Sequence, residues 1–225
     1  MSAGRRDGPD LRLDQRRSPI QARSQRRTQQ ILQVTAMLLA RHGIEGLTTS
    51  MIAQEMQMSV GALYHYFPNK HSILSVLATG WLEDMTFVLD DVLSKQTGEM
   101  SIERLTENIL EGMHDVYRKQ EAVLPLAQGL SAIPELRHLD AEHDNLIISK
   151  MIEMLRRAGF TSTKNELNRV ARVFLELTHS LLIVAVDQDP IRSSRTMTDM
   201  KIMVSALLKK HEAETAAETR NVEAP

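Results

Sequence analysis

The sequence has no cysteine among its 225 residues. This absence excludes disulfides, zinc sites with cysteine ligands and thiol nucleophiles, and it suits the reducing cytosol. Aromatic residues are scarce as well, at 4% of the chain, whereas there are 13 methionines. We therefore expect a core of aliphatic side chains and methionines, since methionine fills irregular spaces readily.

Long apolar runs are missing too. The longest, Leu181 to Val186, is far too short to span a bilayer, and the N-terminus has no apolar signal core. We find no Gly-rich phosphate loop, no nucleophile elbow and no other catalytic set. The hydrophobic content of 42% still suffices for a core. We expect a soluble, cytoplasmic protein that is not an enzyme and has no cofactor, metal or membrane partner.

Charge is unevenly distributed along the chain. Residues 1–70 contain nine Arg and one Lys against five acidic residues, a net charge of +5, whereas residues 71–225 carry −7. A basic front end on an acidic body indicates that the front meets a polyanion such as nucleic acid. The alternative is that these arginines form an ordinary solvated tail.

Hydrophobic periodicity predicts an all-α protein. Residues 1–22 lack such periodicity and are expected to form a flexible basic arm, and residues 213–225 an acidic tail. Helical spacing begins near Ser24 and stops at Gly43, a suitable left-handed C′ residue. No alternation typical of strands occurs. The remaining spacing predicts helices near 70–95, 101–118, 121–131, 135–158, 164–187 and 195–212.

Residues 47–70 show the most informative pattern, two short helices joined by a tight turn. Thr48 and Ser59 are suited to cap the two helices, and Pro68 ends the second because proline disfavours helix at the residue before it. This is the layout of a helix-turn-helix, whose second helix enters the DNA major groove. We therefore predict a DNA-binding domain over residues 23–70 and a helical domain over residues 71–212.

Residues 24–75 resemble the DNA-binding domain of the tetracycline-repressor (TetR) family. The matching residues are Ile31-Leu32, Gly43, Thr48-Thr49, Ile52-Ala53, Ser59, Gly61, Leu63-Tyr64, Tyr66-Phe67, Lys70 and Ile73-Leu74. The resemblance implies a homodimeric repressor that a small molecule releases from a palindromic double-stranded DNA operator. One position departs from the family pattern, because Gln57 stands where glycine is usual. If the backbone there is left-handed, a non-glycine residue costs roughly 1 kcal/mol.

The resemblance also implies how the motif meets DNA. Thr49 is expected on the DNA backbone and Ser50 at a base edge, with Tyr64 and Lys70 on phosphates. Tyr66 is expected to pack inward, because side chains two apart in a helix do not share a face. The complete predicted DNA-binding set is Arg26, Arg27, Thr48, Thr49, Ser50, Ser59, Val60, Gly61, Ala62, Tyr64, His65 and Lys70.

The recognition helix is poor in side chains that read bases. No Arg, Asn or Gln lies between Ser59 and Phe67, so specificity is expected from apolar contacts, Ser50, DNA shape and the arm. Val60 and Ala62 could pack on thymine methyl groups. His65 lies on the exposed side, either as a contact or as a solvated residue.

The helix expected over 164–187 is apolar nearly all round and therefore needs burial on two sides. With the next helix it could form half of an intermolecular four-helix bundle. The alternative is that both helices are the centre of one larger domain. The residues predicted to form the dimer interface are Phe174, Leu181, Leu182, Met200, Met203, Val204 and Leu207.

By resemblance, the helical domain also holds an effector pocket. A cavity lined by aliphatic residues and methionines suits a hydrophobic effector, and the scarcity of aromatics argues against a cation cage. His114 and His179 could orient a polar group, although each predicted residue could instead be plain core. The predicted lining is Trp81, Met85, Phe87, Met113, His114, Tyr117, Phe174 and His179.

Two further functions compete with this interpretation. Glu111–His114 and Glu176–His179 are Glu-x-x-His motifs of the kind that di-iron bundles use, but two of them are close to chance, so we expect no metal. A second cluster, His138, Asp140, His143 and Asp144, is interpreted as solvated polar positions. The other alternative is a nucleoid-type protein that binds DNA without sequence preference.

Overall fold

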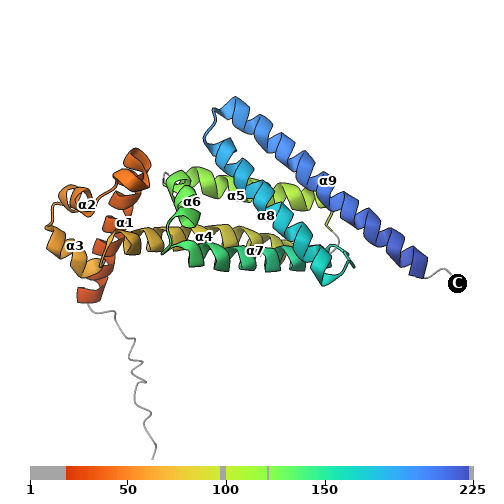
Figure 1. Ribbon diagram of the computed structural model, residues 1–225, viewed down its shortest axis with the longest axis horizontal. Helices are drawn as coiled ribbons and strands as arrows, with labels where there is room; N and C mark the ends of the chain where they lie inside the picture. The colour runs from red at the N-terminus through yellow and green to blue at the C-terminus, as the bar shows by residue number, and fades with distance from the viewer. Residues whose placement is uncertain (1–18, 97–99, 121, 223–225) are drawn as a thin grey trace, which may run out of the picture.

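The computed structural model describes residues 19–96, 100–120 and 122–222, which contain helices and no strand. This confirms the predicted all-α class. A small unit at one end of the molecule is joined through one long helix to a larger helical body (Figure 1). The helices are α1 (Pro19–Gly46), α2 (Thr49–Glu55), α3 (Val60–Tyr66), α4 (Lys70–Lys95), α5 (Ile102–Lys119), α6 (Val123–Ala132), α7 (Arg137–Arg157), α8 (Lys164–Val186) and α9 (Pro190–Val222).

Local sequence signals explain most helix ends. The side chain of Asn69 accepts a hydrogen bond from the Ser72 amide at 2.9 Å, and it starts α4 at the predicted residue. Thr163 and Glu166 form the same kind of reciprocal cap at the start of α8. Gly159, with φ of +93°, follows the end of α7.

The outer helices are longer than predicted. α1 begins at Pro19, so residues 19–22 are helical and not an irregular arm; residues 1–18 of that arm lie outside the described residues. α9 begins at Pro190, where proline is favoured because the first helical N–H has no partner. The same helix continues to Val222, so residues 213–222 of the predicted tail are helical, and residues 223–225 lie outside the described residues. The Ala and Glu residues of that segment are strong helix formers, which explains the extension.

Helices α1 to α3 pack around buried apolar residues that continue into the core of the body. Ile31, Leu39, Ile52 and Leu63 are fully buried. Tyr66 is half-buried against the core, as expected. α1 is interrupted near its end at Gly43, whose φ of 66° and ψ of 178° suit glycine and no other residue. The kink carries residues 44–46 toward the body.

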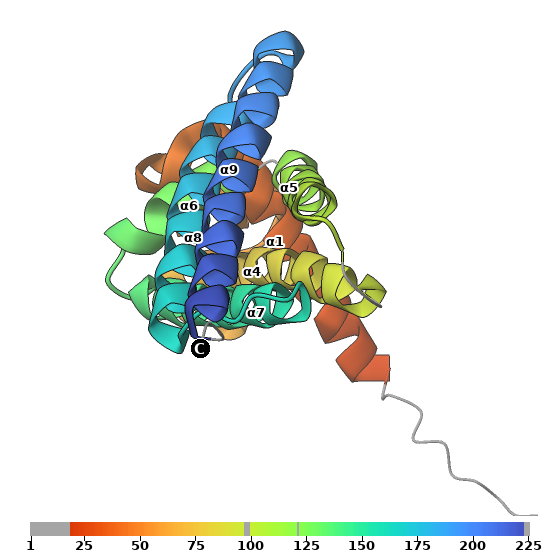
Figure 2. The ribbon, with the colours of Figure 1, turned by 90° about the vertical axis from the view of Figure 1, so that its right-hand side faces the viewer.

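α4 joins this unit to the body and runs along it beside α7 (Figure 1). By length and composition alone, α4 could cross a membrane. Nine of its side chains are buried, and its apolar character is explained by that role in the core. α8 and α9 form an antiparallel pair against the body, and they lie side by side in both views (Figure 2).

Candidate DNA interface and effector cavity

Two side-chain caps fix the starts of α2 and α3. The Thr48 hydroxyl accepts a hydrogen bond from the Met51 amide at 3.2 Å, and the Ser59 hydroxyl accepts one from the Ala62 amide at 3.1 Å. Both predicted N-caps are confirmed. Each cap satisfies an amide that the helix leaves without a partner, so the two helices start at defined residues.

The turn between α2 and α3 is left-handed at Gln57, with φ of 51°. The backbone is therefore left-handed at the position where the family usually has glycine. The Met58 amide donates to the Ala53 carbonyl at 2.9 Å and closes the turn. An L-residue costs roughly 1 kcal/mol in this conformation, so the motif keeps its geometry against a small local strain.

The expected contact residues of α2 and α3 are mostly exposed. Ser50, Ser59, Gly61, Ala62 and His65 are exposed, as is Thr48, and Val60 is half-buried. Tyr64 is 48% exposed, and its hydroxyl lies 3.3 Å from that of Thr49. The two hydroxyls expected on the DNA backbone are therefore neighbours across the two helices.

Two of the basic residues expected at DNA have partners inside the protein. The Lys70 ammonium donates to the backbone carbonyls of Ile44 at 2.9 Å and Leu47 at 3.2 Å. It thereby joins the start of α4 to the end of α1, a role that differs from the predicted phosphate contact. Arg27 donates to the Met56 carbonyl at 2.9 Å, which ties α1 to the end of α2.

Arg26 is exposed, in keeping with its predicted role. An open groove lies between the first turns of α1 and the end of α3, and Arg23, Arg26 and His65 contribute to its walls. Such a basic groove next to the recognition helix would attract a phosphate chain. Arg23 was not in the predicted set, although its place in the Arg-rich start of α1 is the signal that indicates it.

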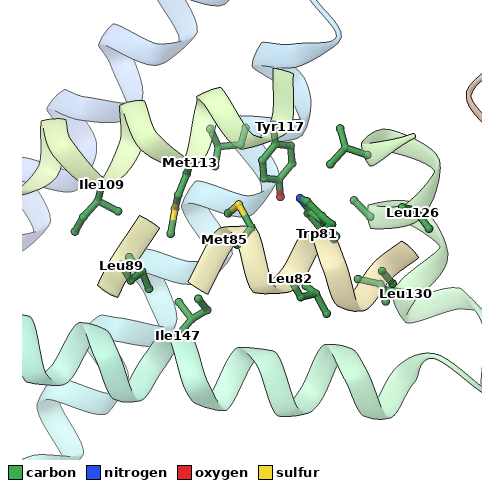
Figure 3. Packing of buried hydrophobic residues seen from close by; sticks show 14 of the residues in the cluster. Trp81, Leu82, Met85, Leu89, Ile109, Met113, Tyr117, Leu126, Leu130 and Ile147 are labelled. Atoms are coloured by element: carbon green, nitrogen blue, oxygen red, sulfur yellow. The ribbon is translucent and has the colours of Figure 1, made fainter. Parts of the chain in front are cut away.

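In the body, α4, α5, α7 and α8 enclose a cavity of about 30 Å³. Trp81 and Met85 of α4 face Met113 and Tyr117 of α5 (Figure 3). The rings of Trp81 and Tyr117 meet edge to face with centroids 5.4 Å apart. Tyr117 Oη lies 3.0 Å from Nδ1 of His179 on α8, so the cavity has a polar end.

Five predicted pocket residues line this cavity, namely Trp81, Met85, Met113, Tyr117 and His179. The other three lie elsewhere. Phe87 is 71% exposed on the outer side of α4. His114 faces a different cleft, where its Nε2 is 3.3 Å from the Ser193 hydroxyl. Phe174 is completely buried in the core beside the cavity.

The sequence analysis missed the contribution of α7. Asp140, His143 and Asp144 line the cavity, whereas His138 is exposed. The interpretation of this cluster as solvated is therefore wrong for three of its four residues. The spacing i, i+3, i+4 was the available signal, because it places these three side chains on one helix face.

Burial dominates the electrostatics of the cavity. It lowers the pKa of His143 to about 4, despite a backbone hydrogen bond with Leu82, and it also lowers the pKa of His179. It raises the pKa of Tyr117 well above its usual value. Because both histidine pKa values are lowered, both rings are uncharged at neutral pH. The pKa of Asp144 is raised to about 6 by burial and then by the nearby carboxylates.

Two buried polar atoms at the cavity have no hydrogen-bond partner, Nε1 of Trp81 and Nε2 of His143. Such atoms cost about 1–3 kcal/mol each when they are left unsatisfied. Because Nε2 of His143 is unpartnered, the hydrogen bond to Leu82 falls to Nδ1, and Nε2 of the neutral ring is an acceptor. The cavity therefore offers one free donor and one free acceptor.

The residues expected at a dimer interface divide into two groups. Phe174, Leu182, Met200 and Val204 are buried within the single chain, so they cannot contact a partner directly. Leu181 and Leu207 are half-buried, and Met203 is 40% exposed. The outward face of α8 and α9 also presents the exposed side chains of Val173, Val184 and Ile202, which were not predicted.

The residues of the two Glu-x-x-His motifs have other partners. Glu111 forms an ion pair with Lys201 at 2.7 Å, and Glu176 pairs with Arg172 at 3.8 Å. His114 and His179 make the hydrogen bonds to Ser193 and Tyr117 described above. Across the ranges that the structure describes, no three potential metal-ligating side chains gather closely enough to hold an ion.

Comparison with known proteins gives two family matches. A family model described as "Bacterial regulatory proteins, tetR family" matches residues 31–77. A second, described as "Tetracyclin repressor-like, C-terminal domain", matches residues 101–208. Together these two ranges cover the DNA-binding unit and most of the body.

Individual relatives are more distant. The chain is 32% identical over 120 residues to the nucleoid occlusion factor SlmA of Haemophilus influenzae (strain PittGG), covering 51% of this chain and 52% of that protein. Thus it spans about half the length of this relative. It is 24% identical over 191 residues to the HTH-type transcriptional regulator PksA of Bacillus subtilis (strain 168), covering 82% and 90%.

Solved structures share the fold. A tetR-family transcriptional regulator from Streptomyces coelicolor superposes with a TM-score of 0.62 at 20% identity, covering 88% of each chain. A TetR-like transcriptional regulator from Rhodococcus sp. RHA1 has the same TM-score at 14% identity, covering 83% of this chain and 96% of that one.

Proposed function

The chain belongs to the tetR family of bacterial regulatory proteins, whose members regulate transcription, and we propose that it is a homodimeric, cytoplasmic repressor. In this proposal the dimer binds a palindromic operator through α2 and α3. A small effector in the cavity of the body releases it. The observation that carries the proposal is the exposed surface on which the Tyr64 and Thr49 hydroxyls meet beside the capped start of α3.

Operator binding is tested by removing one hydroxyl. Tyr64→Phe keeps the ring but loses the hydrogen bond expected on a phosphate, so operator affinity should fall about tenfold, the value of one hydrogen bond to a charged group. The matched control is Tyr66→Phe, because Tyr66 packs against the core. Equal affinities for the wild type and Tyr64→Phe in a gel-shift titration would contradict the assignment.

A second candidate function is sequence-independent binding to the nucleoid. It is favoured by the similarity to a nucleoid occlusion factor over half of the chain. Selection of binding sites from a random DNA pool separates the two functions. A repressor should prefer its selected site over random DNA by at least about a thousandfold, whereas a nucleoid protein should bind both pools alike.

The dimer is proposed to form through the outward face of α8 and α9. Val173 and Val184 on α8 and Ile202 and Met203 on α9 are exposed apolar residues of this pair, which the rest of the described chain does not cover. To bind successive major grooves, two copies that share this face must hold their recognition helices about 34–36 Å apart, one helical turn of DNA. A dimer of this kind buries the same patch on both subunits.

Sedimentation measures the dimer directly. Ile202→Glu combined with Met203→Glu places charges in the proposed interface and should yield monomers. Phe87→Glu is the matched control, since Phe87 is also an exposed apolar residue but lies on α4. If the double variant sediments as the wild type does, this interface is wrong.

α4 is proposed to couple the cavity to the DNA-binding unit. Lys70 at its start holds the end of α1, and Trp81 and Met85 further along line the cavity. A second contact joins α1 to α6, where the Ile44 side chain lies against Gly129. An effector that moves α4 would change the spacing of the recognition helices, provided that it binds the two arrangements with different affinity.

A further inference from the structure

A surface groove between α4 and α7 adjoins the internal cavity. Its volume is about 390 Å³, and it shares two wall residues with the cavity, Leu82 and His143. Its apolar walls include Phe87 of α4 and Leu146 of α7, which are 71% and 43% exposed. The side chains of Leu82 and His143 therefore lie at the boundary between the groove and the cavity.

The cavity itself can receive only a small polar group. A volume of about 30 Å³ exceeds the roughly 10–15 Å³ that one water molecule needs, so the cavity has room for one or two water-sized groups, and a hydroxyl fits where a ring does not. The free donor on Trp81 and the free acceptor on His143 require a group that both accepts and donates a hydrogen bond. A hydroxyl is the smallest group with both capacities.

The charges around both spaces argue against an anion. Asp140 and Asp144 line the cavity, and Glu83, Asp90 and Glu142 line the groove. No Lys or Arg is among the described residues that line either space. Two cations near these carboxylates are already engaged: Lys150 pairs with Asp90, and Arg172, which acts on Asp144, pairs with Glu176.

We propose that the effector is an uncharged single-chain amphiphile whose hydroxyl head enters the cavity between Trp81 and His143 and whose aliphatic tail lies in the groove over Leu146 and Phe87. This inference rests on the proposed function, and it specifies the effector of that site. A quaternary ammonium head would suit the acidic walls, but it cannot accept the hydrogen bond of Trp81. A carboxylate head would accept that bond, but in the cavity it meets the acidic side chains of Asp140 and Asp144.

Trp81 is the single tryptophan of the chain, so its fluorescence reports on this cavity alone. The full-length protein is titrated without DNA with 1-decanol, decanoate and decyltrimethylammonium, which have the same tail and different heads. We expect a saturable change of emission with 1-decanol and at least tenfold weaker binding of the two ions. Equal or tighter binding of either ion, or no saturable change with 1-decanol, overturns the proposal.

The tail is tested with 1-butanol and 1-decanol. Affinity should rise about fourfold for each additional buried methylene. Phe87→Ser combined with Leu146→Ser should weaken the binding of 1-decanol by about tenfold, since the lost apolar contacts are made only by the long tail. The same variant should change the affinity for 1-butanol little. Ile191→Ser is the matched control, because Ile191 is an exposed apolar residue at the start of α9. If the double variant binds 1-decanol as tightly as the control does, the tail does not lie in the groove.

These outcomes are independent of operator binding. If the selected operator is bound and released by some other molecule while 1-decanol leaves Trp81 unchanged, the repressor proposal stands and the effector class is wrong. If 1-decanol binds as expected and no operator can be selected, the cavity assignment stands and the repressor proposal fails.

Discussion

Replacing Lys70 with methionine distinguishes a structural lysine from a DNA contact. Its ammonium donates to the Ile44 and Leu47 carbonyls at 2.9 and 3.2 Å in a half-buried position. Hydrogen bonds of a charged donor contribute about 1.5–3 kcal/mol each. Because Lys70 is partly exposed and its bond to Leu47 is long, we expect the two bonds together to contribute about 2 kcal/mol to the free energy of unfolding. Methionine keeps the apolar stem, so the loss should come from these two bonds.

For a chain of this size, such a loss lowers the melting temperature by roughly 4–8 °C. Operator affinity should fall as well, because the end of α1 is no longer held against α4. The dependence of log affinity on log salt should keep its slope, since no phosphate contact is lost. Calorimetry and operator titrations at several salt concentrations measure both quantities.

Arg26→Met is the matched comparison, since Arg26 is exposed beside the basic groove. It should leave the melting temperature unchanged and reduce the salt slope by about 0.9 for each lost phosphate contact. The reasoning on Lys70 is refuted if Lys70→Met behaves in this way, with a shallower slope and unchanged stability.

Three further predictions concern the body. Gly80→Ala, which meets open space, should stabilise its helix by about 0.5–1 kcal/mol. Gly129→Ala should stabilise the protein less than this, because the added carbon would lie 2.1 Å from the terminal methyl of Ile44, which must move. Thermal unfolding compares the two variants. His143 has a folded-state pKa of about 4, below the usual 6.5, so its contribution to the free energy of unfolding is present above pH 6.5. That contribution is lost as the pH falls toward 4, by at most about 3 kcal/mol. Urea unfolding should therefore show that the stability of His143→Leu falls less steeply with decreasing pH than that of the wild type. The effect of Asp144 on stability has the opposite sign, because its raised pKa of about 6 means that the folded state binds the proton at a higher pH than the unfolded state. Protonation of Asp144 therefore stabilises the wild type as the pH falls from 6 to 4. Asp144→Asn lacks this gain and should lose stability more steeply over the same range.

The features that the sequence predicted well depend on nearby residues. Thr48 and Ser59 cap their helices through amides three positions away, and Gln57 adopts its left-handed backbone within a turn closed by Met58 and Ala53. Periodicity likewise placed α4 at its observed ends, because the Asn69 cap and the apolar spacing agree. Such signals are readable because cause and effect lie within one or two helical turns.

The errors concern contacts between distant segments. The partners of Lys70 lie 23 and 26 residues away, at the end of a helix whose position depends on the kink at Gly43. Phe87 resembles a core residue by type but lies on the solvent side of α4, and His143 resembles a surface residue but points into the cavity. Residue type predicts burial only once the packing of neighbouring helices is known.

The small size of the cavity bears on how an effector could act. A space of about 30 Å³ cannot hold most small molecules, so an effector must bind an arrangement in which Leu82 and His143 have moved apart. These two side chains come from α4 and α7, so an effector that parts them acts on α4, the helix that Lys70 attaches to α1. A ligand shifts an equilibrium only as far as its affinities for the two states differ. The arrangement in which Leu82 and His143 lie together is too small for the effector. The difference in affinity between the two states therefore follows from the packing of these side chains, and no separate transmission pathway through the body is required.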